Sequence, residues 1–237
     1  MRSPDVVVIE HEDDCPPGVL TEVLEGADLA IHRVRPHRGD LLPRSLTNVE
    51  GFVVLGGGMS AMDDEDHPWL APTRALLREA VDRRIPTLAV CLGAQLAAIA
   101  LEGRVEPLET PEVGFIAPEL TDHAAQDPVL SALGDPPQPV LQWHEDAVHT
   151  APPGSRVLAR GPERSVQAFC AAGVLWGVQF HPEATARIVR RWAETSDLLP
   201  KGATPDTVER EFRAAREQTA AARRLLTAWS EQVAPRR

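Results

Sequence analysis

Hydrophobic positions in the first part of the chain fall into short runs separated by amphipathic stretches. Four of these runs are short and mostly apolar, which is typical of strands buried in a parallel sheet. They cover residues 6–9, 29–34, 52–55 and 87–90. Residues 18–25 and 70–84 lie between them and have helical patterns. This alternation predicts an α/β fold whose parallel sheet is covered by helices on both faces.

Further strand candidates follow in the middle of the chain, where prolines mark the loops between them. They cover residues 113–117, 140–142, 156–159, 166–169 and 174–180. With 237 residues the chain is long enough to bury a substantial core. We therefore expect residues 1–195 to form one domain.

The C-terminal segment has a different pattern. Residues 198–203 are typical of a loop, and Thr204 followed by Pro205 is a good start for a helix. Apolar positions then recur at alternating steps of four and three, which predicts a long helix with a heptad-like seam. The seam is Val208, Phe212, Ala215, Thr219, Ala222, Leu226, Trp229 and Val233. We expect residues 196–237 to be a helical extension packed on the same domain; a homodimer or partner surface is the alternative.

Cys91 lies at the point where an apolar strand gives way to a helix of small residues. This is the pattern of a nucleophile elbow, in which Gly93 permits the close backbone approach of a sharp turn. The free N–H groups at the start of the helix favour a thiolate near neutral pH. A buried structural cysteine is the alternative, and Cys91 alone does not exclude it.

A second motif, His181-Pro182-Glu183, ends the strand candidate at residues 174–180. Pro182 cannot donate to a sheet, so the strand stops there. His181 and Glu183 are two residues apart and share one side of an extended chain. The carboxylate can then hold one ring nitrogen while the other faces a thiol, as covalent acyl transfer requires.

Three glycines, residues 56–58, follow the strand at residues 52–55. Such a loop can provide one oxyanion donor beside the elbow, with the Leu92 N–H as the other. A plain strand-to-helix turn is the alternative. The loop lacks the Gly-Lys-Ser/Thr of a phosphate loop and the third glycine of a dinucleotide fingerprint.

Taken together, these motifs resemble the signatures of the class I glutamine amidotransferases. The resemblance rests on residues 90–95 and 177–183, with weaker support from residues 56–58, 112–115 and 144–146. It runs from about residue 6 to about residue 192, and as a stand-alone domain the chain is similar to the glutaminase part of GMP synthase. It implies a flavodoxin-like, doubly wound, mostly parallel sheet with helices on both faces.

By this resemblance Cys91 is the nucleophile, His181 the general base and acid, and Glu183 the residue that orients His181. Gly57 and Leu92 supply the oxyanion N–H groups.

The same resemblance assigns Gly58, Gln95 and His144 to the substrate pocket. The family usually has glycine where this chain has Ala89, and often proline where it has Gly58. The first change crowds the elbow and the second loosens the loop, but neither removes a catalytic group.

Composition narrows the class of function. A net charge of −11 argues against nonspecific binding to nucleic acid or to an anionic membrane, and no apolar run is long enough to cross a bilayer. Three cysteines without a pairing pattern, and no signal-peptide pattern, indicate a reducing cytoplasm. His144 and His149 are five residues apart instead of four, so we expect no metal site, and no cofactor is implied.

The predicted reaction is hydrolysis of the glutamine side-chain amide through a cysteinyl thioester, which releases glutamate and ammonia. The ammonia would serve a separate synthetase subunit, because the chain contains no phosphate loop. A γ-glutamyl hydrolase or peptidase acting on γ-glutamyl conjugates is the alternative enzyme. An inactive regulatory binding domain is a third possibility, which the complete set of Cys91, His181 and Glu183 disfavours.

Overall fold

The computed structural model describes residues 6–233, whose strands form a single ten-stranded sheet. Its main path has the order β2-β1-β3-β4-β10-β9-β7-β5, and β8 pairs with β9 and β6. The strands are β1 (Val6–Ile9), β2 (Ile31–Val34), β3 (Gly51–Val54), β4 (Thr87–Val90), β5 (Arg104–Ile116), β6 (Glu119–Leu120), β7 (Val140–Thr150), β8 (Arg156–Arg160), β9 (Val166–Ala171) and β10 (Leu175–Val178).

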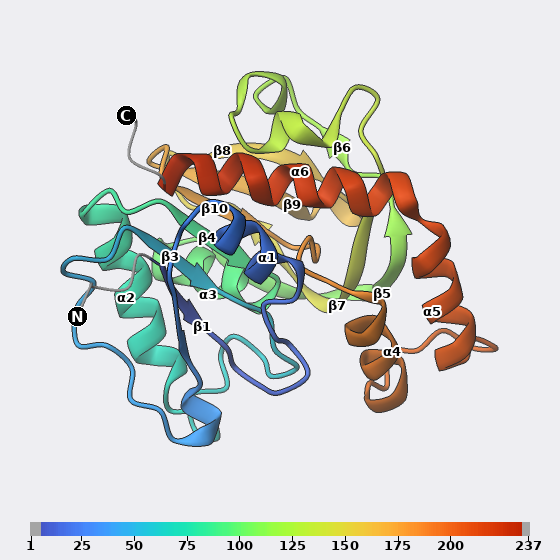
Figure 1. Cartoon of the computed structure of the whole chain (residues 1–237), viewed down its shortest axis with the longest axis horizontal. Coiled ribbons are helices and arrows are strands. Elements are labelled where there is room, and N and C mark those ends of the chain that lie inside the picture. Colours follow the sequence, from blue (N-terminus) through green and yellow to red (C-terminus); the bar gives the residue numbers. More distant parts are fainter. Residues whose placement is uncertain (1–5, 234–237) are drawn as a thin grey trace.

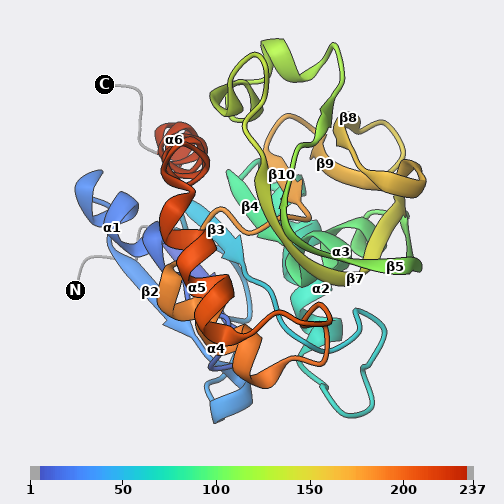
Figure 2. The ribbon, with the colours of Figure 1, turned by 90° about the vertical axis from the view of Figure 1, so that its right-hand side faces the viewer.

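The sheet has a parallel and an antiparallel part. The five strands from β2 to β10 pair in parallel, and these are the short apolar runs that the sequence predicts. From β10 onward, β9, β7 and β5 pair antiparallel and extend the sheet to one side (Figures 1 and 2). The parallel part therefore brings the carboxyl ends of β3, β4 and β10 together at one edge.

Helices cover both faces of the parallel part: α1 (Val19–Gly26) and α6 (Arg216–Val233) lie on one face, and α2 (Leu70–Asp82) and α3 (Leu92–Ala100) lie on the other. The two remaining helices, α4 (Ala186–Thr195) and α5 (Pro205–Ala214), lie beside them, and α4 packs in a separate small core. Short 3-10 helices lie at Pro36–Arg38, Ala124–Gln126, Leu130–Leu133 and Pro162–Arg164. No helix within residues 6–233 is long and apolar enough to cross a bilayer.

Alternating residues of the strands belong to two different cores. In β1, Val6 and Val8 pack with α1 and α6, whereas Val7 and Ile9 pack with α2 and α3. Successive strand side chains point to opposite faces, so a continuous apolar run is what a strand needs when helices lie on both sides. The expected α/β fold, with a mostly parallel core covered on both faces, is confirmed.

Two strands are longer than the sequence pattern indicates. β5 begins at Arg104, and β7 continues to Thr150. The stretch with His144 and His149 therefore belongs to a strand and not to a zinc-binding helix. These strands pair with each other along most of their length. Because much of β5 is not buried, it lacks the continuous apolar run of the parallel strands.

The C-terminal helix begins as predicted but is not continuous. The Thr204 side chain accepts a hydrogen bond from the Thr207 N–H, and Pro205 occupies the first turn of α5. Ala215 then leaves the helical conformation, with φ −79° and ψ 58°, and separates α5 from α6. The prediction of one long helix is therefore wrong at this residue.

The apolar seam of α6 packs against the chain's own sheet. Leu225, Leu226, Trp229 and Val233 are buried in the same core as α1 (Figure 1). In Figure 2, α6 is seen nearly end-on, with α5 and α4 below it. The packing agrees with an extension that covers its own domain; the division at residue 195 remains a prediction.

Trp229→Ala should lower the free energy of unfolding by about 3–5 kcal/mol, because it empties a large, fully buried site between α6 and the sheet. Glu231→Ala, at an exposed position on the same helix, should change it by less than about 0.5 kcal/mol. Urea unfolding followed by circular dichroism measures both. A small effect of Trp229→Ala would contradict the packing of α6 on the sheet.

Candidate active site

Cys91 occupies a strained turn between β4 and α3. Its φ is 50° and its ψ −109°, and its N–H donates to the Val178 carbonyl of β10 at 2.8 Å. A positive φ is uncommon for a residue with a side chain, and such strain is concentrated at functional sites. A Cβ placed on Gly93 would lie 2.1 Å from the Val54 carbonyl oxygen, so only glycine fits there. The predicted strand-to-helix elbow is present.

His181 and Glu183 follow the end of β10 and are both buried. The His181 N–H donates to the Leu141 carbonyl at 2.9 Å, and the Glu183 carbonyl accepts the Val19 N–H at 2.9 Å. His181 Nδ1 lies 2.8 Å from Glu183 Oε1. The carboxylate therefore holds the ring in one orientation and leaves Nε2 free.

Gly56 packs closely against both Cys91 and His181. A Cβ built on Gly56 would be 3.1 Å from His181 Cε1 and 3.5 Å from Cys91 Cβ. No hydrogen bond of regular geometry joins His181 Nε2 to any described residue. The three motifs that the sequence singles out thus meet at one point, at the carboxyl ends of β3, β4 and β10.

The charge state of His181 is set by its neighbours. Burial alone disfavours the charged ring, but the Glu183 carboxylate and the Cys91 sulfur favour it more, and the net effect raises the pKa of His181 to about 10. The ring of Trp192 lies against it, with the ring centroids 4.5 Å apart. His181 is therefore an imidazolium near neutral pH, with an aromatic ring beside it.

Two backbone N–H groups near Cys91 have no partner in the described part of the chain. Among the described residues no acceptor is found for the N–H of Gly57 or of Leu92. A Cβ on Gly57 would lie 2.7 Å from Met59 Sδ, 2.9 Å from Leu92 Cδ2 and 3.0 Å from His11 Cβ. A side chain at residue 57 would therefore displace its neighbours, and the loop packs against the start of α3.

Glu12 holds the glycine loop from the side of β1. Its Oε1 accepts the Gly58 N–H at 2.9 Å and the Cys15 thiol at 3.3 Å. Burial and the Glu12 carboxylate raise the pKa of Cys15 well above its ordinary value, so this second thiol stays neutral. The Gly58 N–H is therefore already engaged, while its backbone still lines the pocket.

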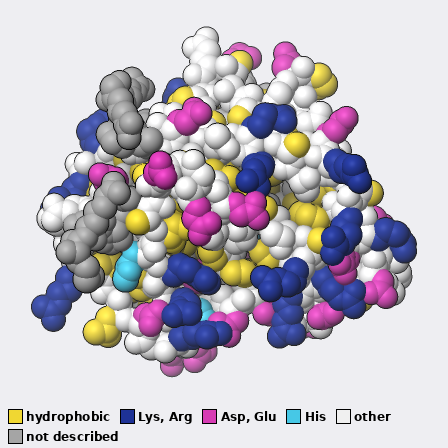
Figure 3. All heavy atoms as spheres, in the orientation of Figure 1, with side chains coloured by type: hydrophobic (Ala, Val, Ile, Leu, Met, Phe, Trp, Pro, Cys, Tyr) yellow, Lys and Arg dark blue, Asp and Glu magenta, His cyan; other side chains and the backbone are white. Residues whose placement is uncertain are grey.

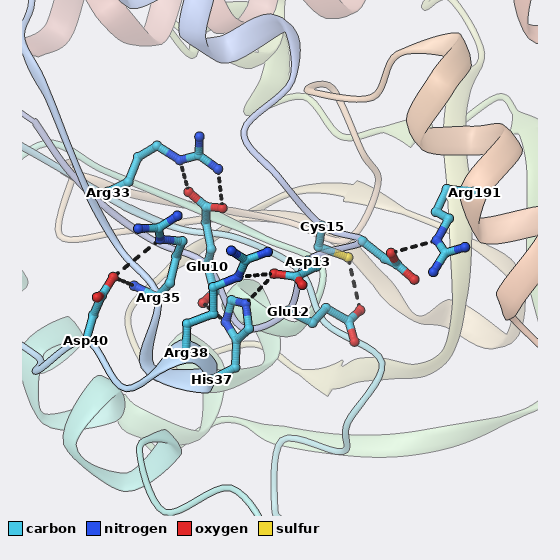
Figure 4. A network of polar contacts seen from close by, with 11 residues as sticks. Glu10, Glu12, Asp13, Cys15, Arg33, Arg35, His37, Arg38, Asp40 and Arg191 are labelled. Atoms are coloured by element: carbon cyan, nitrogen blue, oxygen red, sulfur yellow. Dashed lines mark hydrogen bonds and ion pairs between the residues drawn. The ribbon is translucent and has the colours of Figure 1, made fainter.

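The acidic run at residues 10–14 is partly exposed, and most of its carboxylates have partners in other elements. Glu10 is 2% exposed and pairs with Arg33, while Asp13 binds His37 and Arg38 (Figure 4). Asp14 accepts a hydrogen bond from Arg191 of α4 at 3.0 Å. The run therefore connects β1 to β2, to the glycine loop and to α4.

A cavity of about 490 Å³ opens above Cys91 and His181. Gln95 lines it and donates to the Asp146 carbonyl at 2.8 Å. Among the described residues that line it there are five carboxylates and no lysine or arginine. The carboxylates are those of Glu12, Asp14, Glu145, Asp146 and Asp197.

His144 lines the cavity but also belongs to a buried polar network. Its Nδ1 lies 3.0 Å from the Asp146 carbonyl, and its Nε2 lies 3.1 Å from both Gln142 Oε1 and Glu112 Oε2. Gln167 joins the network through Glu112 Oε2 at 2.6 Å and Gln142 Nε2 at 2.7 Å. Both ring nitrogens of His144 are thus engaged within the protein, and the network fixes β7 behind the pocket.

Sequence reasoning missed Glu12, Cys15 and Trp192 as residues of the pocket. Glu12 and Cys15 follow the carboxyl end of β1, the edge at which ligands bind in parallel sheets, and this position is the signal that could have found them. Trp192 has no such signal, because α4 reaches the pocket only in the folded chain. Within residues 6–233, no three His, Cys, Asp or Glu side chains are grouped to hold a metal ion.

The family model for glutamine amidotransferase class-I matches residues 23–190. A glutamine-hydrolyzing GMP synthase of Thermus thermophilus is 33% identical over 180 residues, which cover 73% of this chain and 34% of that protein. A glutamine-hydrolyzing GMP synthase subunit of Sulfolobus acidocaldarius is 35% identical over 133 residues, which cover 55% of this chain and 66% of that protein. The chain spans about a third of the full-length GMP synthases that it matches.

Two solved structures share the whole architecture. A glutamine amido transferase from Methylobacillus flagellatus has a TM-score of 0.85 at 26% identity and covers 97% of this chain and 95% of its own. A glutamine amidotransferase from Thermotoga maritima has a TM-score of 0.82 at 25% identity, with 96% of both chains covered. The elbow, the glycine loop and the end of β10 thus lie in a fold shared with these enzymes, and the chain belongs to the class-I glutamine amidotransferases.

Proposed function

We propose that this chain hydrolyses the side-chain amide of glutamine through a thioester on Cys91 and releases glutamate and ammonia. One observation supports this above all: the Cys91 thiol, the His181 imidazole held by Glu183, and Gly57, whose N–H has no acceptor among the described residues, line one cavity, with the start of α3 directly after Cys91. Covalent acyl transfer needs a nucleophile, a proton carrier and an oxyanion site, and each has a candidate here.

In the first half of the reaction, the Cys91 thiolate attacks the carboxamide carbon of glutamine. The oxyanion that forms accepts hydrogen bonds from the N–H groups of Gly57 and Leu92. His181, protonated near neutral pH, gives its proton to the departing ammonia, and a glutamyl thioester remains. Glu183 stabilises the imidazolium and keeps Nε2 directed at the reacting atoms.

In the second half, neutral His181 takes a proton from water, which attacks the thioester carbon. The tetrahedral intermediate again rests on the same two N–H groups, and its collapse releases glutamate and restores the thiolate–imidazolium pair. Gln95 and His144 are proposed to shape the wall against which the glutamyl group lies, because both line the cavity. Gly58 is proposed to contact the substrate through its backbone for the same reason.

The ammonia is proposed to serve a separate synthetase subunit. The relative from Sulfolobus acidocaldarius is named as one subunit of a GMP synthase, and this chain matches it over 66% of its length. The full-length GMP synthases are about three times as long as the matching part of this chain. The acceptor would then be bound by another protein.

A second candidate is hydrolysis of a γ-glutamyl conjugate by the same thiol. It is favoured by the size of the cavity, because about 490 Å³ lies in the range that holds drug-sized ligands. Comparing kcat/KM for glutamine with kcat/KM for γ-glutamyl peptides distinguishes the two. The proposal predicts the larger value for glutamine, whereas a much larger value for a conjugate would replace it with the second candidate.

Cys91→Ala should lower kcat for glutamine hydrolysis by at least about 10⁴-fold, because it removes the atom that forms the thioester. Glutamate release in a coupled assay measures the effect. Cys170→Ala is the matched control, since this buried thiol lies in β9 and does not line the cavity. Turnover by a Cys91→Ala protein purified free of other glutaminases would contradict the proposal.

Glu183→Gln should lower kcat by about 10²-fold or more, because the ring loses the carboxylate that favours the imidazolium. Removing a negative neighbour lowers the pKa of His181 from about 10, so the alkaline limb of the pH–rate profile should move to lower pH. Glu194→Gln, on α4 and paired only with Arg190 among the described residues, is the control. An unchanged alkaline limb would contradict the assigned role of Glu183.

A further inference from the structure

A second cavity lies beside residues 180–186, the segment that carries His181 and Glu183. It measures about 490 Å³ and is lined by residues of α5, the beginning of α6, the first residues of α1 and α4, and the ends of β5 and β7. Three phenylalanines contribute to its walls, and the rings of Phe115 and Phe212 lie 5.8 Å apart. The size and the aromatic walls suit a small molecule with an apolar body.

The charge at this cavity is of one sign. Of the described residues that line it, two are arginines, Arg213 and Arg216, and none is Asp or Glu. Arg213 pairs with Glu209 of its own helix, whereas Arg216 has no ion-pair partner within residues 6–233. Figure 3 shows Lys and Arg side chains over α5 and the beginning of α6, with Asp and Glu side chains and apolar surface between them. The cavity above Cys91 and His181, in contrast, is lined by five carboxylates.

The other polar groups at the cavity include two threonine hydroxyl groups and a backbone N–H. The hydroxyl groups of Thr185 and Thr219 are engaged with Ile188 N–H and Ala215 carbonyl, respectively. Because α5 and α6 are separated at Ala215, the backbone N–H of Gln218 has no acceptor among the described residues. The N-terminus of α6, whose first turn also carries Glu217, therefore lies with the two arginines at the edge of a cavity with aromatic and aliphatic walls.

One wall of this cavity belongs to the active site as well. The wall runs from Phe180 to Ala186 and includes His181, Pro182 and Thr185. Glu183 lies within the same segment and holds the His181 ring. A molecule in the second cavity would thus contact the back of the segment whose front faces Cys91.

We propose that the second cavity binds a small carboxylate with an aromatic or acyl body, and that its occupation acts on His181 through the shared segment. The carboxylate lies at Arg216 and the N-terminus of α6, and the apolar body lies between Phe115, Phe212 and the sheet. The proposal concerns a site separate from the glutamine pocket and does not depend on the identity of the reaction.

The test is an NMR titration of the full chain with 4-phenylbutyrate, and with 4-phenylbutanol as its uncharged counterpart. We expect shifts of the Gln218, Thr219 and Ala222 amide signals, a shift of the His181 ring signal, and at least about fivefold tighter binding of the acid than of the alcohol. Arg216→Gln should remove this preference. Arg210→Gln, an exposed arginine on α5 outside the cavity, should leave it unchanged.

Ala222→Trp should block both probes, because it fills the cavity from α6. Equal binding of acid and alcohol, a preference that survives Arg216→Gln, or shifts that do not map to the cavity would overturn the site. Binding without a shift of the His181 signal would overturn the coupling. The same titration of Cys91→Ala separates these outcomes from any failure of the proposed glutaminase activity.

Discussion

The contact between His181 and Glu183 is the interaction on which the site depends. Both side chains are buried, and the imidazole nitrogen lies 2.8 Å from the carboxylate oxygen. Breaking a buried pair of this kind costs about 3–5 kcal/mol, because a charge is left without compensation. The pair also determines chemistry: it favours the imidazolium and leaves one nitrogen for the substrate. The backbone of Glu183 is held by the first N–H of α1, so the contact is tied to the rigid part of the fold.

The parallel sheet explains why distant parts of the sequence meet there. β3, β4 and β10 are neighbours, so the residues that follow them converge at one edge. The sharp turn that places Cys91 at this edge strains the backbone, because a positive φ costs about 1–3 kcal/mol. Close packing of Gly93 against β3, together with the hydrogen bond from the Cys91 N–H to β10, maintains the turn. The glycine loop is fixed in a comparable way by Glu12.

Much of this arrangement follows from local sequence. Each short apolar strand was predictable from its run of residues, and Cys91 and His181 could be placed at strand ends. What escaped prediction depends on contacts between distant residues. The burial of Glu10 requires Arg33 of another strand, and β5 is recognisable only beside β7. The break between α5 and α6 falls at Ala215, and no glycine or proline at that position indicates it in the sequence. It arises where α5 leaves α4 and α6 turns onto the sheet.

The central claim is that Cys91 carries a glutamyl group during turnover. The most direct measurement is acid quenching of the enzyme during turnover of glutamine, followed by mass spectrometry of its peptides. The account predicts a glutamyl adduct on the peptide that contains Cys91. Glutamine turnover with that peptide unmodified throughout, or with the adduct on Cys15 instead, would contradict it.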